Sequence, residues 1–252
     1  MGFDDDLNAC AAIVEKGDPL RFRTVMAAPV AARKTLFPLY AFNVEVSRAP
    51  WVTQEPMIAQ MRLQWWLDAL EEIAAGQGVR RHEVVTPLAG FLTRANAEAL
   101  SALVRARHWD CEKDPFDDAA HLTGYLQHTS GNLMSVAAAC LGGSAGLAQD
   151  AGFALGVANW LRACPALEAQ QRIPLVDGTA EGVRALAQEG LAALASAKSQ
   201  PVQRVALPAF WPASGSGRVL KAAVKTPSHV AAGRLPEPSR LGLTLRAAFG
   251  EW

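Results

Sequence analysis

The stretch from Leu36 to Glu72 constrains the fold most, because apolar side chains recur through it at three- and four-residue steps. This spacing predicts amphipathic helices. Pro50 cannot lie inside a helix without removing a hydrogen bond, so we predict that the first helix ends near Arg48. The apolar stripe is expected at Leu36, Leu39, Tyr40 and Val44 and then at Met57, Met61, Trp65 and Leu70. The segment is therefore predicted to form two helices with a break between them.

The second of these helices has its own start and stop signals. Thr53 offers a side-chain oxygen as an N-cap, and Pro56 falls in the first turn, where its missing N–H is tolerated. Gly76 is a plausible C-cap. We predict a helix over 54–75.

Composition favours helix in the rest of the chain. Of 252 residues, 50% are apolar and only 2 are tyrosine. Ala and Leu are abundant while Ile and Thr are sparse, which favours helix over sheet. A chain of this length can bury a substantial core. The predicted fold class is all-α.

Charge and cysteine content exclude several classes of protein. The 24 basic and 24 acidic residues give zero net charge, so there is no global field to attract nucleic acid or an anionic membrane. The four cysteines have no zinc-like spacing and are expected to be reduced and mostly buried, namely Cys10, Cys111, Cys140 and Cys164. We predict no metal site among them and no nucleic-acid partner.

The start of the chain and its hydropathy suggest a location. Asp4, Asp5 and Asp6 occupy the place where a secretory signal would carry positive charge. No window approaches the ~18–20 uninterrupted apolar residues of a spanning helix. We expect a cytoplasmic protein and leave open a peripheral contact with a membrane.

Further helices follow from the same patterns. They are predicted over 7–16, 19–27, 84–94, 97–107, 121–141, 149–161 and 180–198, with another that begins at Pro29 and is kinked or delayed by Pro38. Prolines and the run Ser214–Gly217 predict an irregular, partly extended segment beyond Pro201, with a last short helix over 241–249. The expected organisation is a helical domain, 1–200, and a Pro-rich tail, 201–252, packing on the same domain.

Two short motifs resemble those of a known family. Tyr40-Ala41-Phe42 and the downstream run Arg62-Leu63-Gln64-Trp65-Trp66 resemble the squalene/phytoene synthases, which join two prenyl diphosphates head to head. The resemblance implies a single isoprenoid-synthase-type helical bundle around a central cavity. It also implies two aspartate-rich motifs that hold Mg²⁺ against diphosphate.

The acidic residues of both motifs are absent. In register, the first motif falls on Ser47, Arg48 and Trp51. The second should follow the N-x-L-R segment Asn159–Arg162, where the acidic positions are Ala163 and Leu167. No catalytic residue and no metal ligand is therefore assigned, and Mg²⁺ is expected only if the chain is a synthase after all.

Nearby residues do not replace the missing acids. Glu45 is interpreted as part of a surface or interhelical ion pair. Pro165 is expected to end its helix. Glu168 is one residue out of register, about 100° around a helix.

A branch of this family resembles the chain more fully. The complex I assembly factor of mitochondria and its bacterial relatives share Ala41–Glu45, Met61–Trp66 and Leu161–Ala163 with Pro165. The resemblance implies a non-catalytic role in assembly of a respiratory-chain complex, with a complex subunit or another assembly protein as partner. Phe210 and Trp211 are a candidate apolar contact for that partner.

Two alternatives remain open at this point. One is a divergent prenyltransferase that condenses prenyl diphosphates, which the missing acids disfavour. The other is a protein that binds a prenyl lipid in the old cavity without chemistry. By the resemblance, the residues facing this cavity would be Tyr40, Val44, Trp65, Asn159 and Arg162. The aromatic ones could equally be core, and Asn159 and Arg162 are expected to join Glu45 or Asp110 in a polar network.

A second polar group has residue types that could bind a metal. It comprises His108, Asp110, Asp117, Asp118, His121 and His128. We interpret these residues as helix caps and solvated helix ends.

Overall fold

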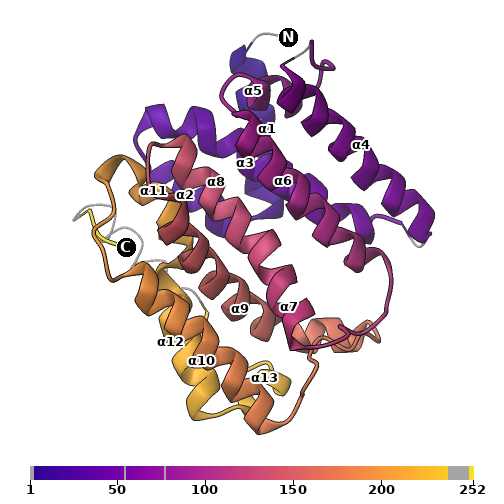
Figure 1. Cartoon of the computed structure of the whole chain (residues 1–252), viewed down its shortest axis with the longest axis vertical. Helices are drawn as coiled ribbons and strands as arrows, with labels where there is room; N and C mark the ends of the chain where they lie inside the picture. Colours follow the sequence, from indigo (N-terminus) through magenta and orange to yellow (C-terminus); the bar gives the residue numbers. More distant parts are fainter. Residues whose placement is uncertain (1–2, 54, 77, 238–249) are drawn as a thin grey trace.

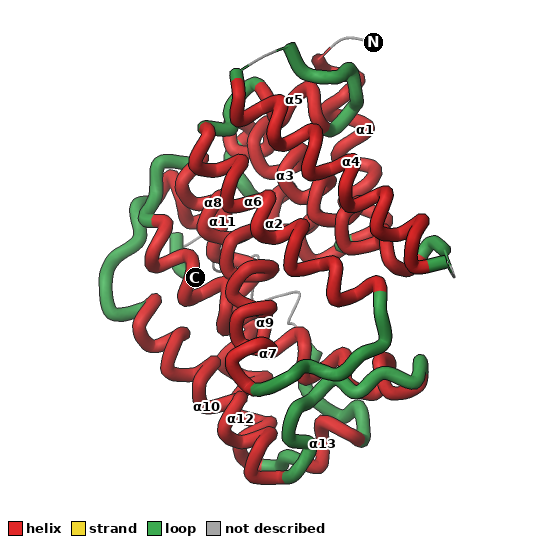
Figure 2. The backbone as a smooth tube through the Cα atoms, turned by 45° about the vertical axis from the view of Figure 1, so that its right-hand side comes forward, coloured by secondary structure: helices red, strands yellow, loops and turns green. Residues whose placement is uncertain are grey.

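The computed structural model describes residues 3–53, 55–76, 78–237 and 250–252, and every regular element within them is a helix (Figures 1 and 2). The first half contains α1 (Phe3–Gly17), α2 (Pro19–Ala27), α3 (Val30–Arg48), η1 (Ala49–Trp51), α4 (Pro56–Ala75), α5 (Val85–Ala89), α6 (Arg94–Ala106) and η2 (Arg107–Cys111). The second half contains α7 (Ala119–Leu126), the π-helical turn η3 (Gln127–Gly131), α8 (Asn132–Cys140), α9 (Ala145–Ala169), α10 (Ala180–Ala197), η4 (Arg204–Ala206), α11 (Leu207–Phe210), η5 (Trp211–Gly215), α12 (Ser216–Lys225) and α13 (Ser228–Ala231). The predicted all-α class is confirmed.

The bundle is organised around α9. This helix packs against α8 and η3 on one side and against α10 and α12 on the other, and Figure 1 shows it near the middle of the molecule. One apolar cluster joins α1, α3, α4, α6, α8 and α11, and a second joins α7, α9, α10 and α12. A central cavity lies where the two clusters meet.

The break between α3 and α4 occurs where it was predicted. Helix α3 ends at Arg48, η1 carries Pro50, and Pro56 opens α4. The prediction of Thr53 as the N-cap was wrong, because Glu55 occupies that position and the Thr53 hydroxyl accepts from its backbone N–H at 3.1 Å. The Thr53 side chain therefore stabilises the turn that precedes α4 and does not cap the helix itself.

The predicted stripe on α4 was wrong for its methionines. Leu70 is buried, but Met57 and Met61 are exposed. The face that packs on the bundle carries Ala59, Leu63, Trp66, Ala69, Leu70 and Ile73. Both faces of the first turns are apolar, so periodicity alone selected the wrong one.

The prediction that Pro165 ends its helix was wrong, because α9 continues to Ala169. A proline removes a single backbone hydrogen bond, and packing on both sides offsets this loss. Cys164 is fully buried, and the Trp160 indole donates to the Pro174 carbonyl at 2.8 Å. The chain turns instead at Gln171, whose φ is 62°.

The segment after Pro201 is largely helical, contrary to the prediction. Pro208 and Pro212 lie in the first turns of α11 and η5, where a missing N–H costs little. Phe210 and Trp211 are buried, so the exposed contact predicted there was wrong. The helix predicted over 241–249 lies outside the described residues.

Two further features concern the chain as a whole. The cysteines are free thiols, three of them buried and Cys140 partly so, as predicted. Among the helices that the structure describes, none combines the length and apolar character needed to cross a membrane.

Candidate functional site

A cavity of about 250 Å³ lies between α3, η1, η2, α7, η3 and α9. Three of its lining residues are Trp51 from η1 and Ala163 and Leu167 from α9. By the resemblance to the family, these are three of the positions expected to carry aspartate. The fold thus brings the two segments together, with an indole, a methyl group and an isobutyl group at these positions.

The other two positions of the first motif lie apart from these three. The Ser47 hydroxyl donates to the Val44 carbonyl within α3, at 3.1 Å. Arg48 is exposed and pairs with Glu45 at 3.3 Å. Glu45 thus forms the surface ion pair that the sequence predicted.

One carboxylate, Asp110, lines the cavity, and its oxygens are already engaged. Arg107 donates to it at 2.9 Å, and the Tyr125 hydroxyl lies 2.9 and 3.1 Å from its two oxygens. Arg107 also donates to the Tyr125 oxygen at 2.7 Å. Asp110 is only 3% exposed, so this closed triad satisfies a carboxylate that would be costly to bury alone.

Burial and charge set the protonation of the triad. Burial raises the pKa of Tyr125 well above its ordinary value, so the phenol stays protonated. Burial alone would lower the pKa of Arg107, but the neighbouring Tyr125 and Asp110 oxygens outweigh it, and the net pKa is raised. The guanidinium therefore remains charged and holds Asp110 in place.

A second buried cation, Arg172, binds the backbone of η2, the element that carries Arg107 and Asp110. It donates to the backbone carbonyls of Asp110 and Glu112, each at 2.6 Å. Its guanidinium lies over the rings of Trp51, at 4.8 Å, and Trp109, at 5.8 Å. These contacts tie the segment after α9 to η1 and η2.

The predicted polar network of Asn159 and Arg162 is absent. Arg162 pairs with Glu237, whereas Asp110 and Glu45 have the other partners described above. Asn159 is exposed and lines both the central cavity and a neighbouring pocket of about 370 Å³ that Arg162 also lines. The premise of a buried amide was wrong.

The remaining three candidates are not among the residues that line the central cavity. Tyr40 is buried beneath the Arg21 guanidinium, 5.3 Å from its ring, and burial raises the pKa of Tyr40 to about 12. Val44 packs against Gly17, where an added Cβ would come within 2.3 Å of its Cγ1 atom. Both are parts of the core around α3.

Trp65 belongs to a different cluster. Its ring lies 4.9 Å from Trp66 and 5.0 Å from His82, with the Arg80 guanidinium 5.0 Å above it. Trp65 is therefore not a cavity residue, and the prediction that it faces the cavity was wrong.

The residues at the cavity do not fit the Mg²⁺ that the fold family implies. Magnesium requires several converging oxygen ligands, but Asp110 is committed to Arg107 and Tyr125. In the described part of the chain, no three His, Cys, Asp or Glu side chains are grouped so as to hold a metal ion. Asp118 caps α7 by accepting from the His121 backbone N–H at 2.7 Å, and Asp117 pairs with the His121 ring.

Sequence reasoning missed Arg107 and Tyr125 as cavity residues, and it missed Arg172 as the cation that binds the carbonyls of Asp110 and Glu112. Arg107 and Asp110 are three residues apart, a spacing that places side chains together on a helical turn, so this pair could have been found. Arg172 gave no local signal, because its partners lie some sixty positions earlier.

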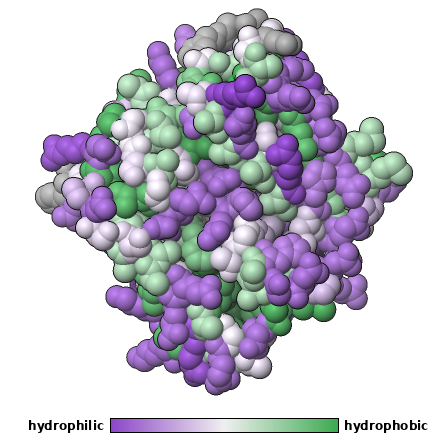
Figure 3. All heavy atoms as spheres, in the orientation of Figure 1, coloured by the Kyte–Doolittle hydropathy of each residue, from purple (hydrophilic) through white to green (hydrophobic). Residues whose placement is uncertain are grey.

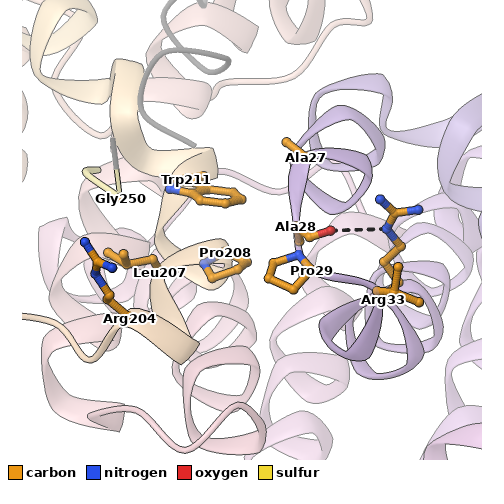
Figure 4. Close-up of a pocket in the computed structure, with 10 residues that line it drawn as sticks. Ala27, Ala28, Pro29, Arg33, Arg204, Leu207, Pro208, Trp211 and Gly250 are labelled. Carbon is orange, nitrogen blue, oxygen red and sulfur yellow. Dashed lines mark hydrogen bonds between the residues drawn. The ribbon is translucent and has the colours of Figure 1, made fainter. Parts of the chain in front are cut away.

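Two larger hollows lie elsewhere on the molecule. Figure 4 shows one of about 510 Å³ between the α2–α3 junction and α11, with Pro29 facing Pro208 and Trp211. There Arg33 donates to the Ala28 carbonyl at 3.2 Å. The other, of about 520 Å³, is a mainly apolar cleft between the 172–183 segment and α13.

The fold defines an isoprenoid-synthase-type helical bundle. A family model described as squalene/phytoene synthase matches residues 14–184, and the chain belongs to the squalene/phytoene synthase family. A dehydrosqualene synthase crystallised with a ligand has a similar structure, with a TM-score of 0.76 over 98% of this chain and 96% of that one. Sequence identity is 13%, so this likeness shows the fold alone.

Two curated relatives belong to the assembly-factor branch. The chain is 31% identical over 182 residues to the Drosophila melanogaster NADH dehydrogenase (ubiquinone) complex I, assembly factor 6 homolog, covering 66% of this chain and 53% of the relative. It is 25% identical over 162 residues to the human complex I assembly factor 6, covering 62% and 48% respectively. The chain thus spans about half the length of these relatives.

Proposed function

We propose that this protein is a non-catalytic squalene/phytoene synthase relative that acts in the assembly of a respiratory complex of the complex I type. One observation carries the proposal: Trp51, Ala163 and Leu167 meet at the cavity where the family's metal-binding acids would converge. The names of the two curated relatives supply the assembly role. The partner would be a subunit of the complex or another assembly protein.

Cavity size and charge argue against the condensation of prenyl diphosphates. A pocket for one drug-sized ligand has roughly 300–1,000 Å³, whereas this cavity has about 250 Å³ and two substrates would have to share it. Ionisation of an allylic diphosphate also needs a metal or similar charge to take up the leaving group. Among the described residues that line the cavity, Asp110 is the one carboxylate, and Arg107 already neutralises it.

The alternative of a bound prenyl lipid is favoured by one feature, the apolar cleft of about 520 Å³ lined by Ile173, Leu175, Val183 and Val230. This volume lies within the range of ligand pockets. Mass spectrometry of organic extracts from the purified protein tests it. Recovery of no stoichiometric isoprenoid would reject this alternative.

Deletion of the gene in its own organism separates assembly from synthesis. The proposal expects loss of NADH:quinone oxidoreductase activity with an unchanged isoprenoid profile. The reverse outcome would reject it in favour of a synthase. As a biochemical control, the purified protein with Mg²⁺ and farnesyl diphosphate should release no pyrophosphate.

A further inference from the structure

A straight stripe of exposed side chains runs along α4. Met57, Met61, Gln64, Asp68 and Glu71 follow each other at steps of four and three, which places them on one helical face. Met57 is 70% exposed and Met61 is 66% exposed. Figures 1 and 2 both place α4 at the edge of the molecule, and the five stripe residues are all exposed.

The stripe, hereafter the α4 stripe, has two chemically different halves. Its first half is apolar, and Val52 and Ile58 extend it beside the start of the helix. Its second half is polar and acidic, and Gln64 donates to Asp68 at 2.7 Å. Arg62 lies about 100° around the helix from Met61 and so stands outside the stripe.

The fold gives no reason for this arrangement. Exposed methionines add nothing to the core, because the opposite face of α4 makes the packing contacts. The acidic residues lie toward the carboxyl end of α4, where the helix macrodipole disfavours negative charge. Helix α4 has no acid in its first turn and no base in its last, so the charges are placed against the intrinsic preference of the helix.

We propose that the α4 stripe docks an amphipathic helix of a partner protein, whose contacting face carries apolar residues at one end and lysine or arginine at the other. The stripe is one side chain wide and about 21 Å long at 1.5 Å per residue, the shape that a single helix covers. Methionine adapts to varied apolar partners. Basic residues on the partner would neutralise Asp68 and Glu71 and fix its direction.

Other occupants fit the stripe less well. An anionic membrane surface would repel its acidic half. A second copy of the chain would pair acid with acid in a parallel arrangement and acid with methionine in an antiparallel one. The proposal rests on the proposed assembly function, which requires a protein partner.

Two synthetic amphipathic helical peptides test the proposal with the full chain. They share one leucine face, and their polar positions are lysine in one and glutamate in the other; binding is followed by fluorescence anisotropy. The lysine peptide should bind at least about tenfold more tightly than the glutamate peptide, a difference of about 1.4 kcal/mol. Equal affinities would overturn the proposal.

Variants locate the binding on α4. Met57→Gln with Met61→Gln, and separately Asp68→Lys with Glu71→Lys, should each weaken the lysine peptide by about tenfold or more. The matched control is Val205→Gln on η4, because Val205 is 61% exposed and lies outside the stripe. Exposed substitutions of this kind should leave the unfolding midpoint unchanged. An equal loss in the control variant would overturn the assignment.

Further outcomes decide between occupants and between the two proposals. The natural chain is also tested for binding to phosphatidylcholine or phosphatidylglycerol vesicles and, by light scattering, for self-association. The proposal would be overturned if the chain bound vesicles or self-associated and the methionine variant abolished that binding or self-association. Full rescue of complex I activity in the deletion strain by the methionine variant would reject the docking role of the α4 stripe and leave the proposed assembly function intact. Normal complex I activity in the deletion strain, with peptide docking still lost in both variants, would reject the assembly function alone.

Discussion

The Arg172 guanidinium carbon lies 4.8 Å from the centre of the Trp51 ring, and Trp51 is one of the residues that line the central cavity. The same guanidinium holds the carbonyls of Asp110 and Glu112. A carboxylate at position 51 would offer a ligand to a metal, whereas an indole offers a surface for a cation that is already part of the protein. Trp51 and Arg172 thus make structural contacts with each other and with the segment 110–112.

Restoring the acids should restore metal binding without synthase activity. In the triple variant Trp51→Asp, Ala163→Asp, Leu167→Asp, three carboxylates would converge on one cavity. Saturating Mg²⁺ should then raise the unfolding midpoint by roughly 5–10 °C, as expected for a ligand at about 100 times its Kd in a chain of this size. Differential scanning calorimetry with and without Mg²⁺ measures the shift.

The matched control for this variant replaces the same three residues by Asn, which keeps the shape and removes the charge. Mg²⁺ should not change its midpoint, nor that of the natural chain. The absence of a shift in the Asp variant would show that the three positions do not converge as the structure places them.

The effects of substituting Arg107 and Asp110 on the free energy of unfolding should be strongly coupled. Arg107→Met leaves a buried carboxylate short of its charged partner, which costs about 3–5 kcal/mol. Asp110→Asn in the same chain should recover much of this loss, because the buried charge is removed. Urea unfolding of both single variants and the double variant gives the coupling energy, and strictly additive effects would contradict the triad.

Phe210 should act as core and not as a docking residue. Its side chain is 0% exposed, so Phe210→Ala should cost about 3–5 kcal/mol of unfolding free energy. Val205→Ala, on the exposed turn just before it, should change stability by no more than about 0.5 kcal/mol. Equal, small effects of the two changes on the free energy of unfolding in urea would indicate that Phe210 is a surface contact and not part of the core.

Two predictions that depended on local backbone chemistry succeeded, although Thr53 as an N-cap did not. The break after Arg48 follows from Pro50, and the cap of α7 follows from Asp118, because each acts within a few residues of itself. The all-α class followed from composition. These features do not require knowledge of what packs where.

Predictions that depended on distant partners failed. Pro165 could remain inside α9 because the helix is held by neighbours on both sides, and Met57 is exposed because α4 buries a different face. Likewise, Arg162 pairs with Glu237, a residue far along the chain. The family resemblance places the missing acids at Trp51, Ala163 and Leu167, and these three residues line one cavity in the structure.

His82 should make stability depend on pH. Its ring packs against Trp65 and Trp66, and Nδ1 lies 3.1 Å from the Val84 backbone N–H. Burial is the largest influence and lowers the pKa of His82 below its ordinary value, although Glu83, Glu45 and Asp6 oppose this and Arg81 adds to it. The unfolded chain, in which the imidazole titrates near pH 6.5, therefore binds the proton more readily.

The sign of the effect follows from this difference. Between the two pKa values the unfolded state holds more protons, so the free energy of unfolding falls as pH drops from about 6.5 toward the folded pKa. In His82→Asn, an amide oxygen can still accept from Val84 and nothing titrates, so the decline between about pH 7 and pH 5 should be shallower. His108, whose pKa burial also lowers, leaves a residual slope. Urea unfolding across this range measures the slope of the unfolding free energy against pH, with the exposed His121→Asn as the control. An unchanged slope in His82→Asn together with a reduced slope in His121→Asn would show that His82 is not the histidine responsible.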